Sequence, residues 1–507
     1  MKRHTLVLSD VHLSQAHPFD PDDPLWMRYR RQEHHPDAEF AALVDHLLAV
    51  HGDDRIEIVF NGDVLDFDAP WVKDGVSSFD ELPPTDGGCA EQARLILADH
   101  QPFFRAAAKA LAAGHEVTFM SGNHDIELFW PGVRTAIRDE LARLVASLPA
   151  EDRRLDVVDL DRTLRFRAWF HLTDDRIYFE HGSQYDIHNS VRHAAVPLTK
   201  KGDRIHPVLG KLAFRRTGSR MGYFNPYYEE TFYMGLFGYL GHFARFYALS
   251  RRHIARTWLF GSLSTIFEIW SHRHADERVE EGRAALRAEL GADISDEAID
   301  ATHALRTPLA EETMIPVVRE LWVDRVALAF FSLLAIALSA LLGGLVASAI
   351  AAGVIVGLFV VYELVTPKPD IRTYDSAPPT VLRLFDIHGV RAICMGHTHR
   401  PFARFTDKGL YANSGSWCPA FEDQQCTKPV LDGRPVLWLT TERLEATGEE
   451  HLYGGLHWWR RGAFVADAEA SRARPVVAER DQDEEAVAVS APPTSCAPAE
   501  PTSERAV

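Results

Sequence analysis

The chain has 507 residues, 46% of them hydrophobic and 25% charged, the composition of an ordinary folded protein long enough for two to four structural units. The formal net charge of −18 argues against nucleic acid as the main partner, because surfaces that bind nucleic acid usually carry a basic excess. The five cysteines show no CxxC spacing, so neither a disulfide scaffold nor a zinc ribbon is expected.

Residues 1–190 alternate between short apolar runs and stretches with the spacing of amphipathic helices. The predicted strands here are Thr5–Ser9, Ile56–Phe60, Val117–Met120 and Ile177–Glu180, and the predicted helices are Ala38–Val50 and Glu91–Ala113. The strand-rich pattern returns over residues 376–465, with predicted strands at Ala392–Met395, Leu410–Ala412 and Val436–Thr440. We therefore expect an α/β (α+β) domain built from two separated stretches of chain.

Five short polar motifs follow these strands. They are Asp10-Val11-His12, Gly62-Asp63-Val64-Leu65-Asp66, Gly122-Asn123-His124-Asp125, His181-Gly182 and Gly396-His397-Thr398-His399. Side chains at i and i+2 of a strand end point to the same side, so each Asp-x-His or His-x-His pair can chelate one ion. Carboxylates mixed with imidazoles suit Mn, Fe or Zn rather than Ca, and their number exceeds the needs of one tetrahedral ion. Two divalent metal ions are predicted, with Mn favoured.

Each motif by itself is a weak signal. An isolated Asp-x-His is more often a surface pair than a ligand pair. His181 alone would be a satisfied core histidine, and Gly-Asn-His-Asp can form a turn. The ordered set of five, each at the exit of a predicted strand, is what indicates a functional site.

This ordered set resembles the calcineurin-like metallophosphoesterase superfamily, whose motifs read Asp-x-His, Gly-Asp-x-x-Asp, Gly-Asn-His-Asp/Glu, His and Gly-His-x-His. The resemblance covers residues 5–190 and 380–420. It implies a double β-sheet sandwich flanked by helices, here interrupted by an insert. It also implies hydrolysis of a phosphoester or pyrophosphate bond by attack of a metal-bridging hydroxide on phosphorus.

The resemblance also implies a role for each motif residue. Asp63 would bridge the two metals. The resemblance assigns one metal to Asp10, His12 and His399, and the other to Asn123, His181 and His397. His124 would be the acid beside the phosphate, oriented by Asp66. Asp125 could instead be the partner of His124 or a helix N-cap.

Within the superfamily, Ser9–Leu13, Gly396–Pro401 and Asn413–Trp417 resemble the membrane-associated UDP-2,3-diacylglucosamine pyrophosphatases of lipid A synthesis. Those enzymes usually carry Arg where this chain has His124. The resemblance therefore implies the same class of reaction but does not identify the substrate. Protein phosphatases of the superfamily usually carry Arg at the places that hold Phe67 and Ser121 here, so protein phosphatase activity is not expected.

Residues 191–312 are predicted to form a helical insert. Its first part, residues 191–274, holds 13 Lys and Arg against 4 acids and is rich in aromatic residues. Such a segment suits the surface of an anionic membrane. The alternative is a helical insert with solvated arginines and a buried aromatic face.

Residues 313–375 contain a run of 37 residues without a charge, Val326–Tyr362. As one helix this run would be roughly 55 Å long, nearly twice the ~30 Å hydrocarbon core of a bilayer. Gly343-Gly344 lies near its middle, so we predict a transmembrane helical hairpin. One long tilted span and a soluble apolar hairpin are the alternatives. Two crossings also return the chain to the side where the fifth motif must join the other four.

The flanks of the apolar run predict its sidedness. Basic residues lie beyond both ends, namely Arg319, Arg325, Lys368 and Arg372, which favours a cytoplasmic location for both ends. No export signal is recognisable before the first predicted strand. We expect a membrane protein whose catalytic domain is cytoplasmic. Residues 466–507 are predicted to be a disordered acidic tail.

Three residues near the motifs are candidate substrate contacts: Arg400 beside the last histidine, and His188 and Asn189 shortly after His181. Arg400 could instead pair with a surface acid, and the other two could make loop contacts. The arginines of Arg28–Arg31 could also contact phosphate, although a solvated helix face is the simpler interpretation.

The sequence therefore predicts a metal-dependent phosphoesterase that acts on a membrane-associated, lipid-linked substrate. The alternative enzyme is a tethered phosphodiesterase or phosphatase for soluble nucleotides. The alternative from another class is a non-catalytic membrane scaffold, which would be expected to have gaps in the ligand set. The five motifs contain no such gap.

Overall fold

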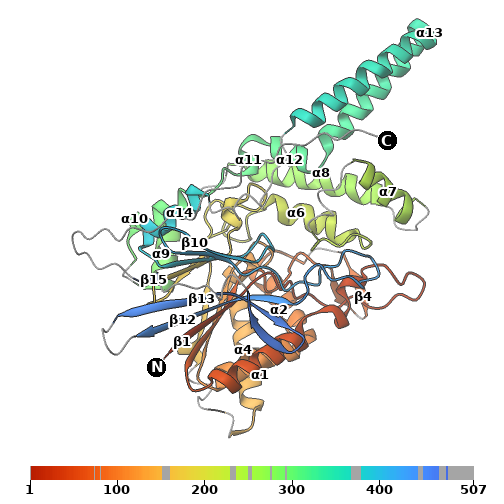
Figure 1. Ribbon diagram of the computed structural model, residues 1–507. Coiled ribbons are helices and arrows are strands. Elements are labelled where there is room, and N and C mark those ends of the chain that lie inside the picture. Colours follow the sequence, from red (N-terminus) through yellow and green to blue (C-terminus); the bar gives the residue numbers. More distant parts are fainter. Residues whose placement is uncertain are drawn as a thin grey trace, which may run out of the picture.

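The computed structural model describes residues 2–73, 75–79, 82–150, 153, 160–228, 236–248, 254–274, 277–291, 294–366, 378–443, 449–467 and 476–477. These residues form a mixed α/β fold, as the sequence predicts (Figure 1). Two main β-sheets carry helices on their outer sides, and an apolar helical segment projects away from them.

The larger sheet has eight strands in the order β14-β13-β12-β1-β2-β5-β6, with β15 paired to β13. Its strands are β1 (Arg3–Leu8), β2 (Arg55–Asn61), β5 (Glu116–Met120), β6 (Leu164–Arg167), β12 (Arg434–Arg443), β13 (Glu450–Arg460), β14 (Ala463–Ala466) and β15 (Val476–Val477). The neighbours β1, β2, β5 and β6 are parallel, whereas β12 runs antiparallel to β1. The central parallel strands are apolar runs because both of their faces are buried.

The smaller sheet has the order β10-β11-β9-β8-β7. Its strands are β7 (Phe170–Leu172), β8 (Ile177–Glu180), β9 (Ala392–Met395), β10 (Phe402–Phe405) and β11 (Leu410–Asn413), and a separate hairpin joins β3 (Trp71–Lys73) to β4 (Val76–Ser78). Strands β8 and β9 are parallel neighbours, with Ile177 opposite Ala392. Parallel neighbours need a crossover connection, so the whole of residues 181–391 serves as one crossover.

The two sheets share a core. Val7 and Val59 of the larger sheet pack in one cluster with Phe179 and Cys394 of the smaller sheet, whereas Leu6 belongs to the cluster beneath the helices. This alternation follows the two-residue period of a strand. The helices joined to these cores are α1 (Asp37–His51), α2 (Asp86–Asp99), α3 (Gln101–Ala112), α4 (Pro131–Ser147), α5 (Leu160–Thr163) and α14 (Pro379–His388).

The helix predicted over Glu91–Ala113 is in fact two helices, α2 and α3, which separate at His100. The buried ring of His100 contacts Asp37 at 3.0 Å and the carbonyl of Ser14 at 2.8 Å. Pro102 lies in the first turn of α3, where its missing N–H leaves no helical hydrogen bond unmade. Apolar spacing continues through the break, which is why the pattern predicted one helix.

The insert predicted over residues 191–312 is helical. Its helices are α6 (Leu209–Arg216), α7 (Leu236–Phe246), α8 (Ile254–His272), α9 (Val279–Leu290), α10 (Asp296–His303) and α11 (Ala310–Thr313), followed by α12 (Ile315–Glu320) at the start of the next unit. Several basic side chains of the insert are paired internally, such as Arg192 with Glu311 and Arg216 with Glu268. Arg192 and Arg216 are therefore held inside the insert and are neither solvated nor turned to a membrane, while the prediction for the rest of the segment stays a prediction.

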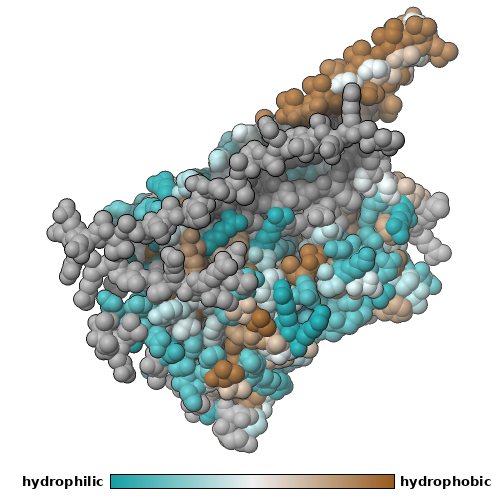
Figure 2. Space-filling model, viewed as in Figure 1, coloured by the Kyte–Doolittle hydropathy of each residue, from teal (hydrophilic) through white to brown (hydrophobic). Residues whose placement is uncertain are grey.

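The apolar run forms α13 (Val323–Val365), the segment among the described residues that is long and apolar enough to cross a membrane. Its backbone leaves helical geometry at Gly344, where φ is +72°. The hydroxyl of Tyr362 donates to Asp324, so the two ends meet and the segment is a hairpin of two arms, each roughly 30 Å long (Figure 1). Its apolar surface projects from the rest of the molecule (Figure 2).

Parts of two predictions lie outside the described residues. These parts are the flanking Lys368 and Arg372, and the acidic tail apart from residues 466–467 and 476–477. The strands β14 and β15 include described residues that the sequence analysis assigned to the tail, so the larger sheet extends further than predicted.

Phe60 is a test of the core under the larger sheet, because its ring packs against Phe40, Phe103 and Phe119 and has no exposed surface. We expect Phe60→Ala to lower the free energy of unfolding by about 3–5 kcal/mol, since it leaves a cavity that its neighbours cannot fill. Urea unfolding in detergent, followed by tryptophan fluorescence, measures the change. The exposed Val50 of α1 provides the control Val50→Ala, and equal stability of the two variants would contradict this packing.

Candidate metal centre

The five predicted motifs meet at one edge of the two sheets. Three of them follow β1, β2 and β5 of the larger sheet, and two follow β8 and β9 of the smaller sheet. The carboxyl ends of parallel strands lie at the same edge, which brings loops from distant parts of the chain together. Residues 10 and 399 thereby become neighbours.

The backbone of these loops is strained in a repeated way. The predicted ligands Asp10, His12, Asp63, His397 and His399 all have positive φ, between 53° and 69°. Such a conformation is uncommon for residues other than glycine, and it concentrates at functional sites because the surrounding structure must hold it. Backbone hydrogen bonds between the first two motifs supply that support, at 3.1 Å from Asp10 N to Gly62 O and 3.0 Å from His12 N to Asp63 O.

The first ligand set is Asp10, His12 and His399, whose ligand atoms lie within 4.8 Å of one another. His399 Nε2 lies 3.2 Å from Asp10 Oδ1 and 3.4 Å from His12 Nε2. Asp10 Oδ1 is buried and accepts no hydrogen bond of good geometry. Burial raises the pKa of Asp10, but the imidazoles of His399 and His181 outweigh it and hold the pKa at about 2. The carboxylate is therefore charged and available to a cation.

The second ligand set is Asp63, His181 and His397, with Asn123 beside it. His181 Nε2 lies 3.1 Å from both Asp63 Oδ2 and Asn123 Oδ1. The other ring nitrogen, Nδ1, lies 3.0 Å from the carbonyl of Asn61, so its proton faces that carbonyl and Nε2 is left to bind a metal. A Cβ on Gly62 would come 2.4 Å from His181 Nδ1, which explains the glycine before Asp63.

Asp63 lies between the two sets. Its Oδ2 is 3.1 Å from His181 of the second set and 4.0 Å from His12 of the first set, while Oδ1 accepts from the backbone N–H of His124 at 2.7 Å. Burial raises the pKa of Asp63, but His181 and His124 hold the pKa well below its usual range. A charged carboxylate shared by two ligand sets is the geometry expected of a residue that bridges two cations.

Asp125 proves to be neither of the two alternatives considered for it. Its carboxylate accepts from the backbone N–H groups of Asp63, Val64 and Gly122 at 3.1, 2.8 and 2.6 Å. It makes no capping bond for the short helix that follows. Burial and the neighbouring Asp63 raise the pKa of Asp125 to about 7. Asp125 therefore fastens the loop after β2 to the loop after β5.

His124 lies beside the ligand sets, with its ring centroid 4.7 Å from that of His12. Its Nδ1 is 3.4 Å from Asp66 and 3.2 Å from Asp68. Burial disfavours the charged ring, but Asp63, Asp66 and Asp68 raise the pKa of His124 well above its usual value. The predicted contact with Asp66 is present, and Asp68 is a second partner that the sequence analysis missed.

Asp68 connects the site to the insert. Lys211 and Arg215 of α6 each reach Asp68 Oδ1 at 3.0 Å, and both contact the buried Glu127. Lys211 also lies 3.2 Å from the carbonyl of His124. Basic side chains of the insert thus neutralise acids behind the site. The one signal in the sequence for this contact is that Lys211 and Arg215 are four residues apart, a spacing that places both side chains on the same face of a helix.

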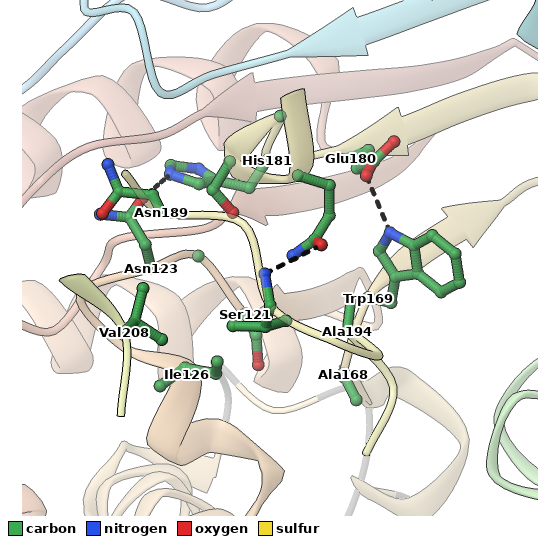
Figure 3. Close-up of a pocket in the computed structure, with 15 residues that line it drawn as sticks. Ser121, Asn123, Ile126, Ala168, Trp169, Glu180, His181, Asn189, Ala194 and Val208 are labelled. Atoms are coloured by element: carbon green, nitrogen blue, oxygen red, sulfur yellow. Dashed lines mark hydrogen bonds between the residues drawn. The ribbon is translucent and has the colours of Figure 1, made fainter. Parts of the chain in front are cut away.

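A second missed residue is Asp186, whose Oδ2 lies 3.0 Å from His397 Nε2. Asn189 donates to the same carboxylate at 2.6 Å, and its side chain lies close to those of His181 and Asn123 (Figure 3). His188 instead points toward Glu320 near the hairpin, at 3.6 Å. Arg400 is exposed, and its contact with phosphate stays a prediction.

The arginines near the first motif are not solvated, contrary to the simpler interpretation of Arg28–Arg31. Arg30 and Arg31 are buried and donate to the carbonyls of Pro70 and Pro24. They stabilise loops beside the site, because a buried guanidinium needs such acceptors.

A small cavity lies behind the second ligand set, lined by Asn123, His181, Asn189, Trp169 and Glu180 among others (Figure 3). Its volume of about 20 Å³ is enough for a water molecule and too small for a substrate. Substrate must therefore approach the ligands from elsewhere. His399, with a fifth of its side chain exposed, is the most accessible ligand of the first set.

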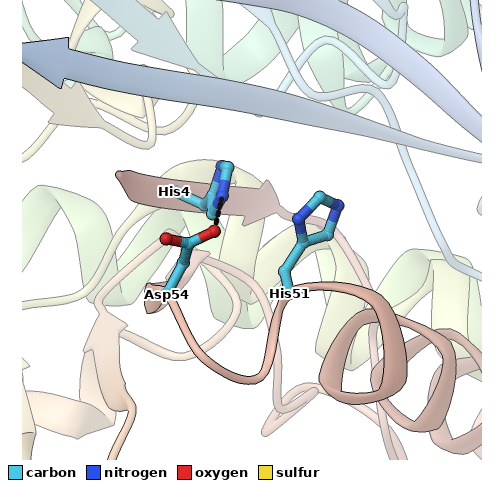
Figure 4. Close-up of side chains that lie close together, drawn as sticks. All are labelled: His4, His51 and Asp54. Carbon is cyan, nitrogen blue, oxygen red and sulfur yellow. Dashed lines mark hydrogen bonds and ion pairs between the residues drawn. The ribbon is translucent and has the colours of Figure 1, made fainter. Parts of the chain in front are cut away.

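A group of ligand-type residues away from the site, His4, His51 and Asp54, lies at the opposite end of β1 (Figure 4). His4 stacks on Trp438 and makes contacts through both ring nitrogens, with Thr440 at 2.9 Å and with Asp54 at 3.4 Å. Ordinary hydrogen bonding and stacking account for this group.

Asp63→Asn tests the shared carboxylate. Asparagine keeps an acceptor for the His124 N–H but loses the charge between the two ligand sets. We expect the parent protein to bind about two Mn²⁺ per chain and the Asp63→Asn variant to bind far fewer. Metal analysis after loading and gel filtration measures this. Asp45→Asn, on the exposed side of α1, is the matched control. Parent-like metal content in Asp63→Asn would contradict the assignment.

Comparisons with models of protein families, with curated proteins and with solved structures gave no match to this chain. The chemistry of the site is therefore inferred from the contacts of its own residues.

Proposed function

We propose that this protein is a membrane-bound, dinuclear-metal-dependent hydrolase of a phosphoester or pyrophosphate bond, with the calcineurin-like metallophosphoesterases as its superfamily. The observation that carries the proposal is the shared carboxylate of Asp63 between two Asp/His ligand sets, beside a histidine held by two acids. The shared core of the two sheets, with helices outside, supports the double β-sheet sandwich of that superfamily.

The residues present fit two divalent ions. Asp10, His12 and His399 would hold one, Asn123, His181 and His397 the other, and Asp63 both. When bound, such ions lower the pKa of a shared water and neutralise phosphoryl oxygens. Mixed carboxylate and imidazole ligands suit Mn, Fe or Zn, and Mn²⁺ is the first ion to test.

His124 is the residue suited to protonate the leaving oxygen. Its raised pKa keeps the ring charged at neutral pH, so it can stabilise negative charge at phosphorus and donate a proton. Asp66 orients the ring and is itself fixed, because the hydroxyl of Tyr227 donates to its Oδ2 at 2.6 Å. Asp68 provides the second orienting contact.

The hairpin supports a membrane-associated substrate. The hairpin lies between the fourth and fifth motifs in the sequence. Its exposed apolar surface is next to the helices that contact the site. A lipid-linked phosphoester or pyrophosphate, on the cytoplasmic face, is the substrate class that fits this arrangement. A tethered hydrolase of soluble nucleotides is the alternative, and a scaffold without catalysis is disfavoured by the complete ligand set.

Removing His124 separates binding from catalysis. His124 also falls in a candidate group with His12 and Asp66, but it is in neither of the two sets that Asp63 joins. We therefore expect His124→Ala to keep both metals and to lower turnover by about 10²–10⁴-fold. Hydrolysis of a chromogenic phosphodiester with added Mn²⁺, alongside metal analysis, measures the two effects. His46→Ala on α1 is the control, and parent-like turnover of His124→Ala would refute the assigned role.

The substrate class is tested on the full chain in detergent with Mn²⁺. We expect lipid pyrophosphates to be hydrolysed with a higher kcat/KM than cyclic nucleotides or nucleoside diphosphate esters, because the hairpin holds the site at a membrane. A protein lacking Val326–Tyr362 should lose that preference, since Asp324 and Tyr362 lie together and the gap can be closed by a short linker. An unchanged lipid preference in the truncated protein would contradict the role given to the hairpin, and a higher kcat/KM for nucleotides in the full chain would favour the soluble-nucleotide alternative.

A further inference from the structure

The helix α8 has one buried face and, on the opposite side, one exposed apolar face. One face packs inward, with Ser262, Thr265 and Ile269 buried. The other face carries five large side chains that are 44–69% exposed, namely Leu259, Phe260, Leu263, Phe267 and Trp270. At 100° per residue these five fall on one stripe about 100° wide, and we call them the outer face of α8. Scattered exposed apolar residues are normal on a protein, whereas a continuous stripe marks a binding surface.

The outer face lies at the root of the hairpin. Trp258 of α8 donates to the carbonyl of Leu321 at 3.2 Å, two residues before α13 begins. Ile269 packs in one cluster with Val317 and Leu321, and Val323 of the hairpin packs against that cluster. Figure 1 shows α8 directly beneath the base of α13. These contacts join the buried side of α8 to the root of the hairpin, so α8 lies at the base of α13 with its outer face turned away from that packing.

The outer face has arginines at both ends. Arg256 lies over the ring of Phe260 at 5.8 Å, and Arg273 lies over Trp270 at 4.5 Å. Aromatic rings with flanking basic groups are typical of helices at the boundary between headgroups and acyl chains, where the arginines meet lipid phosphates. A second copy packed antiparallel on this face would bring Arg256 of one chain near Arg273 of the other, which like charges disfavour.

We propose that the outer face of α8 lies in the interface of the same bilayer that the hairpin enters, with Arg256 and Arg273 on anionic headgroups. The proposal rests on the hairpin's insertion, not on the phosphoesterase chemistry. A hairpin alone can tilt and rotate, whereas a hairpin and an interfacial helix at its root fix the orientation of the protein on the membrane.

This attachment reaches the candidate site through α6. Leu209 and Leu212 of α6 pack with Ile269 of α8, while Lys211 of the same helix pairs with Asp68 behind His124. One helix thus contacts both the membrane-seated element and the acids that orient His124. The outer face of α8 therefore sets the height of the site above the lipid surface.

The test uses the full chain in vesicles of phosphatidylcholine and phosphatidylglycerol, with benzoylphenylalanine, a photo-crosslinking amino acid, at one position per sample. We expect lipid adducts, read by mass spectrometry, when it replaces Phe267 or, at the hairpin tip, Leu342, which is 87% exposed. The exposed Glu280 of α9 is the control position and should give none.

Adducts at 342 without adducts at 267 would overturn the proposal for α8, and so would a crosslinked dimer from position 267. Absence of adducts at both positions would overturn the hairpin's insertion as well. A second variant checks the face as a whole: Phe260→Glu with Phe267→Glu should reduce lipid adducts at position 263 by on the order of tenfold. Phe405→Glu on β10 is the matched control. None of these readouts depends on activity, so they remain informative if the proposed function fails.

Discussion

The carboxylate of Asp63 is the point on which the rest of the candidate site depends. The backbone carbonyl of Asp63 accepts from the N–H groups of Val11 and His12, and its backbone N–H donates to the carboxylate of Asp125. One oxygen of the Asp63 carboxylate accepts from the backbone N–H of His124. Three loops are therefore fixed by one residue. The second carboxylate oxygen faces both ligand sets. A charge buried at such a position is stable only when hydrogen-bond donors or cations surround it.

The insert offsets the electrostatic repulsion between the acids that are buried close together at the site. Asp66, Asp68 and Glu127 are buried close to Asp63, and like charges in a low dielectric repel strongly. Lys211 and Arg215 supply the compensating positive charge from α6. The basic character of the insert is thus partly a property of the site, and the part that we propose for the membrane is the outer face of α8 with its flanking arginines.

The connection between β8 and β9 explains how so long an interruption leaves the site intact. The two strands are parallel neighbours, so the chain leaves at the carboxyl end of β8 and must cross back to the amino end of β9. The contact between Asp324 and Tyr362 closes the hairpin at its root. The chain then returns through α14 to β9, and the fifth motif emerges beside the fourth. An excursion into a membrane is compatible with this topology because it starts and ends at one point.

The sequence by itself determined the types of the candidate ligand residues, their order and their places at strand ends. It did so because strand periodicity and the Asp, His and Asn side chains are local features that need no partner to be read. Strands such as β8 and β9 have the predicted bounds, and all seven predicted ligands come together. Local pattern also located the turn of the hairpin, since Gly344 adopts a φ that other residues rarely take.

Only the tertiary structure decided which groups contact one another across long stretches of chain. Asp68 and Asp186 belong to none of the five motifs. Their roles follow from contacts that the fold creates, Asp68 with His124 and Asp186 with His397. Asp125 had two local interpretations, and the loop after β2 gave it a third. The break at His100 depends on Asp37, more than sixty residues earlier in the chain. Such contacts are set by packing between distant elements, which periodicity along one element does not encode.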